Sequence, residues 1–84
     1  MDITNVDEVK GLKQNMRTVF ETPQGKEVMK FLEKSCGWYE SVFDPVDRDR
    51  VLLNAGRREV IATIKTFLDQ PPEYIVALAQ MKEQ

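Results

Sequence analysis

The stretch Glu21-Thr-Pro-Gln-Gly-Lys-Glu-Val-Met-Lys-Phe-Leu32 contains the clearest structural signal in the chain. Thr22 precedes Pro23, and proline at the first position of a helix sacrifices no hydrogen bond there. Further on, Gly37 suits a helix end, because glycine adopts a left-handed backbone at little cost. Apolar residues recur between these signals at helical spacing. The sequence therefore predicts a helix from about Pro23 to Cys36.

Helical spacing continues on both sides of this segment. Before it, Thr4 is the predicted N-cap of a first helix whose apolar residues lie three or four positions apart. After it, Asp44-Pro45 repeats the threonine-proline start signal and predicts a long helix that ends near Asp69. That helix has a near-heptad apolar stripe, made of Leu53, Gly56, Val60, Ile64 and Phe67.

Pro71 and Pro72 must stop the long helix, since neither can donate a backbone hydrogen bond. The residues after them predict a short last helix over about 72–83. The fold class is therefore all-α: a small bundle of three main helices plus a short C-terminal helix. We expect one helical domain over 1–84, with its core within about 4–69, and close helix contacts at Gly25 and Gly56.

Composition excludes several classes of function. The 84 residues carry a net charge of −2, whereas dedicated nucleic-acid binders usually have a basic excess. The chain contains no histidine, the commonest general base and metal ligand. The lone Cys36 can form no internal disulfide. Because no apolar run approaches the length of a membrane span, we expect a soluble intracellular protein that is not an enzyme and binds no metal or cofactor.

Eight residues are candidate partner contacts: Trp38, Tyr39, Arg57, Arg58, Ile75, Val76, Leu78 and Met81. Aromatic side chains such as the first two often anchor interfaces, although they also close over the ends of small bundles. The adjacent arginines point about 100° apart on a helix, so one of them is expected to pair with an acidic side chain of a neighbouring helix and the other to face outward.

The apolar residues of the last helix exceed what a short terminal helix needs unless it docks on something. The last helix could dock on one of three partners: its own bundle, a second copy of the chain, or another protein, which it would bind as a helix in a groove. Two basic helix faces are interpreted mainly as solvated surface, with weak nucleic-acid binding as the alternative. These faces contain Lys10, Lys13 and Arg17, and Lys26, Lys30 and Lys34.

Two motifs resemble those of a known family. Val19-Phe20-x-Thr22-Pro23-x-Gly25-x-x-Val28-Met29-x-x-Leu32 is followed by Gly56-Arg57-Arg58-x-Val60-Ile61-x-x-Ile64. This pattern is similar to that of small proteins encoded by short-tailed bacteriophages and prophages, and it covers roughly residues 17–68. The resemblance implies a place among phage structural genes, but no defined molecular role.

These observations favour a non-enzymatic bacteriophage protein that acts by protein–protein contact, in virion assembly or as a minor virion component. Its partner would be a phage structural protein or a second copy. An inhibitor that binds a host protein is the alternative, and weak nucleic-acid binding through the lysine faces is the third. The expected location is the host-cell cytoplasm or the virion.

Overall fold

The computed structural model of the chain describes residues 2–82 and confirms the all-α prediction. These residues contain four helices and no strand. The helices are α1 (Val6–Phe20), α2 (Pro23–Ser35), α3 (Arg48–Asp69) and α4 (Pro72–Lys82). Glu83, at the end of the predicted last helix, lies outside the described residues.

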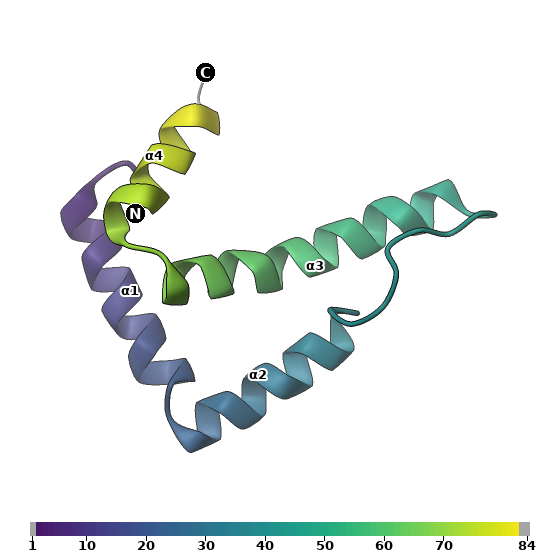
Figure 1. Cartoon of the computed structure of the whole chain (residues 1–84), viewed down its shortest axis with the longest axis horizontal. Coiled ribbons are helices and arrows are strands. Elements are labelled where there is room, and N and C mark those ends of the chain that lie inside the picture. The colour runs from purple at the N-terminus through teal and green to yellow at the C-terminus, as the bar shows by residue number, and fades with distance from the viewer. Residues whose placement is uncertain (1, 83–84) are drawn as a thin grey trace.

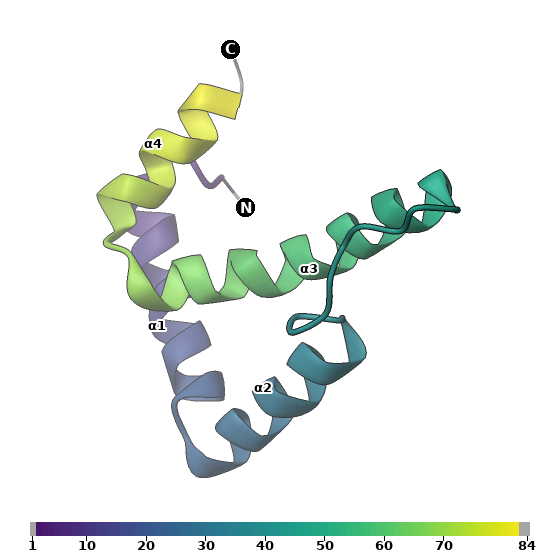
Figure 2. The same ribbon diagram turned by 45° about the vertical axis from the view of Figure 1, so that its right-hand side comes forward.

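The four helices form a flat, open arrangement that measures 44 × 38 × 18 Å. Helices α1, α2 and α3 enclose three sides of a triangle, and α4 packs against α1 and α3 at one corner (Figure 1). The N-terminal part of α3 extends well beyond the other helices in both views (Figures 1 and 2). The core therefore cannot run along the whole length of the longest helix.

Two predicted helix starts are displaced along the chain. Asn5, not Thr4, caps α1: its side-chain oxygen accepts from the amides of Asp7 and Glu8 at 2.9 and 3.3 Å. The amide and hydroxyl of Thr4 instead donate to the carboxylate of Asp2. An Asn side chain is as good a cap as Ser or Thr, and here it lies directly before the first helical residue.

Helix α3 begins three residues later than the Asp44-Pro45 signal predicts. Asp44 accepts from the amides of Val46 and Asp47 at 2.9 and 3.0 Å, which makes a turn rather than a helix cap. Asp47 then caps the helix by accepting from the amide of Arg50 at 3.1 Å. The hydrogen bonds from the two amides lower the pKa of the Asp44 carboxyl below its ordinary value.

The core lies at the corner where α1, the C-terminal part of α3 and α4 meet. Val9, Phe67, Ile75 and Val76 form its buried cluster, with Val6, Leu12 and Met16 of α1 packed against it. Ile61, which is completely buried, lies further back along α3.

The predicted stripe on α3 is only partly correct. Phe67 is buried, but Leu53 and Val60 are 60% and 57% exposed. A side chain at Gly56 would meet nothing within 4 Å, so the expected helix contact there is absent from the described chain. The helix nevertheless continues through Gly56 without a break.

Gly25 makes the close helix contact that the sequence predicts. Thr22 caps α2 by accepting from the amide of Gly25 at 3.0 Å, and this turn presses Gly25 against the end of α1. A Cβ atom added to Gly25 would lie 1.8 Å from the carbonyl oxygen of Val19 and 2.7 Å from the Cα atom of Phe20. Both neighbours are backbone, so neither can move aside cheaply.

The double proline leaves two carbonyls at the end of α3 without their usual partners. In a continuing helix, the carbonyls of Phe67 and Leu68 would accept from the amides of residues 71 and 72. Both of these residues are proline and have no N–H. The ammonium group of Lys13 on α1 replaces the missing donors.

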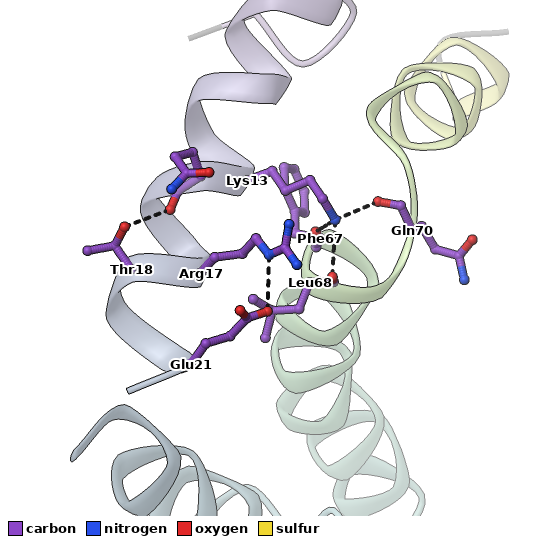
Figure 3. Close-up of polar contacts among 8 residues, drawn as sticks. Lys13, Arg17, Thr18, Glu21, Phe67, Leu68 and Gln70 are labelled. Carbon is purple, nitrogen blue, oxygen red and sulfur yellow. Dashed lines mark hydrogen bonds and ion pairs between the residues drawn. The ribbon is translucent and has the colours of Figure 1, made fainter. Parts of the chain in front are cut away.

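Lys13 Nζ donates to the carbonyl oxygens of Phe67, Leu68 and Gln70 at 2.8, 3.0 and 2.9 Å (Figure 3). Its positive charge also lies at the negative end of the α3 dipole, and the last turn of α3 contains no basic residue of its own. One side chain therefore joins α1 to the junction between α3 and α4.

We expect Gly25→Ala to destabilise the protein by roughly 1–3 kcal/mol or more, because the added methyl group overlaps the backbone of α1. The matched control is Gly11→Ala, where the added methyl group has open space and alanine favours the helix by up to about 1 kcal/mol. Thermal or urea unfolding of the two variants measures the difference. Equal stability would show that α1 and α2 do not meet at Gly25.

Lys13→Met keeps most of the apolar stem but removes all three hydrogen bonds to the end of α3. We expect a loss of roughly 2–3 kcal/mol, as is typical when hydrogen bonds from a charged group are removed from partly buried acceptors. Lys10→Met on the exposed side of the same helix should change the unfolding free energy by less than about 0.5 kcal/mol. Similar losses in both variants would contradict the role of Lys13.

Candidate functional site

The C-terminal end of α2 places Trp38 against α3. The amide of Trp38 donates to the carbonyl of Glu33 at 2.8 Å, and that of Gly37 donates to Lys34 at 3.3 Å. With Gly37 at a φ of 67°, this is a Schellman motif, which turns the chain sharply at the helix end. The predicted glycine stop is confirmed, with Cys36 as the capping residue.

Trp38 lies between two cationic side chains of α3. The guanidinium of Arg58 is 5.2 Å from the centre of the indole ring and the ammonium of Lys65 is 4.8 Å from it. Both distances are typical of cation–π interactions. Arg58 Nε is buried and has no hydrogen-bond partner among residues 2–82. The ring therefore gives this guanidinium a favourable contact where Nε has no hydrogen bond.

A buried carboxylate adjoins this ring. Glu33 is 6% exposed, accepts from the hydroxyl of Tyr39 at 2.5 Å and lies 3.5 Å from Lys65 Nζ. The hydrogen bond from Tyr39, assisted by the charge of Lys65, lowers the pKa of Glu33 in spite of its burial. The same hydrogen bond raises the pKa of Tyr39, because the phenol must keep its proton to donate.

The two predicted arginine sites both contact the end of α2. The guanidinium of Arg57 donates to the carbonyl of Ser35, and Arg58 stacks on Trp38. Neither contact is with an acidic side chain, which differs from the expected ion pair. Arg57 instead supplies a donor and a positive charge at a helix C-terminus, as Lys13 does for α3.

Trp38, Tyr39, Arg57 and Arg58 therefore come together in space, although the ring of Tyr39 remains 79% exposed. Every ionisable group in this cluster has a partner within the fold. The arrangement holds α2 against α3.

The candidate residues of α4 lie apart from that cluster and differ among themselves. Ile75 and Val76 are buried in the core, so this helix docks on its own bundle, one of the three alternatives left open by the sequence. Met81 is 69% exposed. Leu78 is half-buried and lines a largely apolar groove of about 270 Å³ between α3 and α4.

A second set of apolar side chains, which sequence reasoning missed, is exposed to solvent. On the long loop between α2 and α3 (residues 36–47), Phe43 and Val46 are 72% and 93% exposed. Leu52 at the projecting end of α3 and Phe31 on α2 are 70% and 68% exposed. The sequence signal that could have revealed Leu52 is its position along α3. Leu52 lies on a different side of this helix from the residues that face α2.

The predicted basic faces do not form one uninterrupted patch. Lys13 is occupied at the end of α3, and Arg17 Nε pairs with Glu21 at 3.1 Å (Figure 3). Lys26 and Lys30 line a hollow between α2 and α3 that also includes acidic side chains. Mixed charge of this kind is ordinary protein surface.

The fold and these surfaces define a class of protein. It is a small helical protein that exposes apolar side chains and uses charged side chains to hold its helices together. The chain belongs to the family of Bbp19-like phage proteins, whose family model matches residues 16–80. The sequence-based resemblance to small phage proteins is thereby confirmed. No curated protein and no solved structure shows significant similarity to it. None of the helices described here is long and apolar enough to cross a membrane.

Tyr39→Phe should make stability depend less on pH in acid. The lowered pKa of Glu33 stabilises the fold fully above the ordinary carboxyl pKa of 4.5, and this contribution is lost as the pH falls through the lower, folded-state value. Without the tyrosine hydroxyl, the pKa of Glu33 should rise and its contribution should shrink. Urea unfolding of both proteins between pH 3 and 7 tests this expectation.

The difference in unfolding free energy between the wild type and Tyr39→Phe should be largest near neutral pH and diminish below pH 4.5. Tyr74→Phe is a matched control, because Tyr74 lies on α4 and does not contribute to the lowered pKa of Glu33. A difference that stays constant down to pH 3 would rule out the coupling between Tyr39 and Glu33.

Proposed function

We propose that this phage protein is not an enzyme and acts by protein–protein contact, in virion assembly or as a minor component of the virion. The observation that carries the proposal is the exposure of large apolar side chains on α2, the long loop and α3. Phe31, Phe43, Val46 and Leu52 are each at least 68% exposed. Phe43, Val46 and Leu52 follow one another within ten residues of the loop and the start of α3, and exposed apolar patches mark surfaces that other proteins cover.

The distribution of the core supports the same conclusion. Burial is concentrated where α1, α3 and α4 meet, while residues 43–55 contain no buried side chain. A chain of 84 residues has little apolar surface to spare for stability. Leaving these side chains exposed therefore has a cost for the isolated molecule, which contact with another protein would offset.

The polar chemistry of the chain also favours contact over catalysis. The most buried ionisable group, Glu33, is held by Tyr39 and Lys65. Its lowered pKa makes it a weaker base than a free carboxylate, whereas a general base works best with a pKa near the operating pH. This cluster is therefore best understood as the joint between α2 and α3.

The test uses the phage that encodes the chain, with an epitope tag added to the gene. We expect the tagged protein to remain with particles after washing in high salt, at a constant ratio to the major structural proteins. A phage lacking the gene should accumulate incomplete particles, and the chain supplied from a plasmid should rescue it.

Normal yields of infectious particles without the gene, together with its absence from washed wild-type particles, would contradict an assembly role. A single host protein recovered at a fixed ratio from infected cells would then favour the host-protein inhibitor. Retention in particles and recovery of a host enzyme are independent readouts, so the two functions are separable in one infection.

A further inference from the structure

The exposed face of α3 carries a stripe of uncharged residues, two of which are large and apolar, while the face toward α2 includes several polar side chains. Leu52, Gly56, Val60 and Thr63 recur at steps of four, four and three, and all four are exposed. The face toward α2 contains the half-buried Asn54, Arg58 and Lys65 beside the buried Ile61. Leu52 and Val60 therefore point away from the protein's own interior and flank Gly56 on the exposed face.

We propose that this stripe binds a second copy of the same chain, with the two α3 helices antiparallel about a two-fold axis near Gly56. Leu52 and Val60 are each four residues from Gly56. In this arrangement, Leu52 of either copy lies opposite Val60 of the other, as a self-complementary interface requires. Gly56 has open space above it, so the two backbones can approach closely.

The same register gives the most exposed apolar residue of the loop a place to bind. Val46 is 93% exposed and precedes Gly56 by ten residues. Because it directly precedes the Asp47 cap of α3, it comes near the C-terminal part of α3 in the second copy, where Thr66 lies. Thr66 lines the apolar groove of about 270 Å³ between α3 and α4, together with Ile75 and Leu78.

The charges beside the stripe are compatible with this pairing. Arg48 and Glu59 project on the same side of the stripe, and both are exposed. In the antiparallel register, Arg48 lies about 7.5 Å along the axis from Glu59 of the second copy, five residues at about 1.5 Å each. This is within the reach of an arginine side chain, and the opposite charges favour this orientation.

The surface that a standard interface buries is a small part of the surface of this chain. A standard interface buries about 800 Å² on each partner. That area is about one eighth of the 6350 Å² exposed by the chain.

The direct test is the molar mass of the wild-type protein in solution, measured by sedimentation equilibrium over a concentration series. We expect a reversible dimer, and Leu52→Glu should raise its dissociation constant at least about tenfold by placing an unpaired charge in the interface. Phe31→Glu is the matched control, since Phe31 is equally exposed but lies on α2. Circular dichroism confirms that both variants are folded.

A wild type that stays monomeric up to millimolar concentration overturns the proposal. Equal weakening of the dimer by Leu52→Glu and Phe31→Glu, or no weakening by Leu52→Glu, overturns the assignment to α3. Neither measurement depends on phage particles. This inference can therefore fail while the proposed function stands, and the proposed function can fail while this inference stands.

Disulfide trapping tests the register in a Cys36→Ser background. Gly56→Cys should form a covalent dimer on mild oxidation, because the two copies of residue 56 meet at the axis. Leu52→Cys alone should not, since its copies are about 12 Å apart along the axis, beyond disulfide reach. A mixture of Leu52→Cys and Val60→Cys proteins should cross-link. Efficient linking of Leu52→Cys to itself would overturn the antiparallel arrangement.

Discussion

The contact between the Lys13 ammonium and the end of α3 determines how the rest of the molecule is arranged. Two consecutive prolines allow α4 to turn back sharply toward α1, but they also remove the donors that the carbonyls of Phe67 and Leu68 would otherwise use. A buried or half-buried carbonyl without a donor is costly. Lys13 meets both carbonyls at once, together with that of Gln70, and thereby fixes α1 against the turn.

A similar device joins α2 to α3. The guanidinium of Arg57 donates to the carbonyl of Ser35, and the turn at Gly37 directs Trp38 onto Arg58 and Lys65. In both joints, a cation from one helix satisfies the C-terminal end of another. Such contacts fix the directions of helices without needing a large shared apolar surface. This explains how so small a core can support an open triangle with one projecting helix.

Much of the fold follows from local signals in the sequence. Thr22-Pro23 starts α2, Gly37 ends it, and the double proline ends α3 at Asp69, as the sequence predicts. The start of α3 was displaced because two aspartates compete: Asp44 takes the turn and Asp47 takes the cap. Local hydrogen-bonding capacity is visible in a sequence, but which of two nearby aspartates caps the helix depends on the path of the loop.

The joints and the exposed surface could not be predicted in the same way. Lys13 looks like any solvated lysine of an amphipathic helix, because its partners are carbonyls more than fifty residues away. The stripe predicted on α3 was expected to face the protein's own core, but its residues Leu53 and Val60 are exposed. Periodicity shows that a face is apolar but not what covers it. Of the eight predicted contact residues, Trp38, Arg57 and Arg58 serve the internal joint, and Ile75 and Val76 serve the core.

Backbone amide hydrogen exchange, at a concentration low enough to keep the chain monomeric, tests the central claim most directly. The claim is that one corner of the triangle holds the fold and leaves the far end of α3 free to meet another protein. We predict strong protection from residue 61 to the end of α3 and on the packed faces of α1 and α4, with rapid exchange over residues 48–55 of the same continuous helix. Equal protection along both halves of α3 would contradict this account.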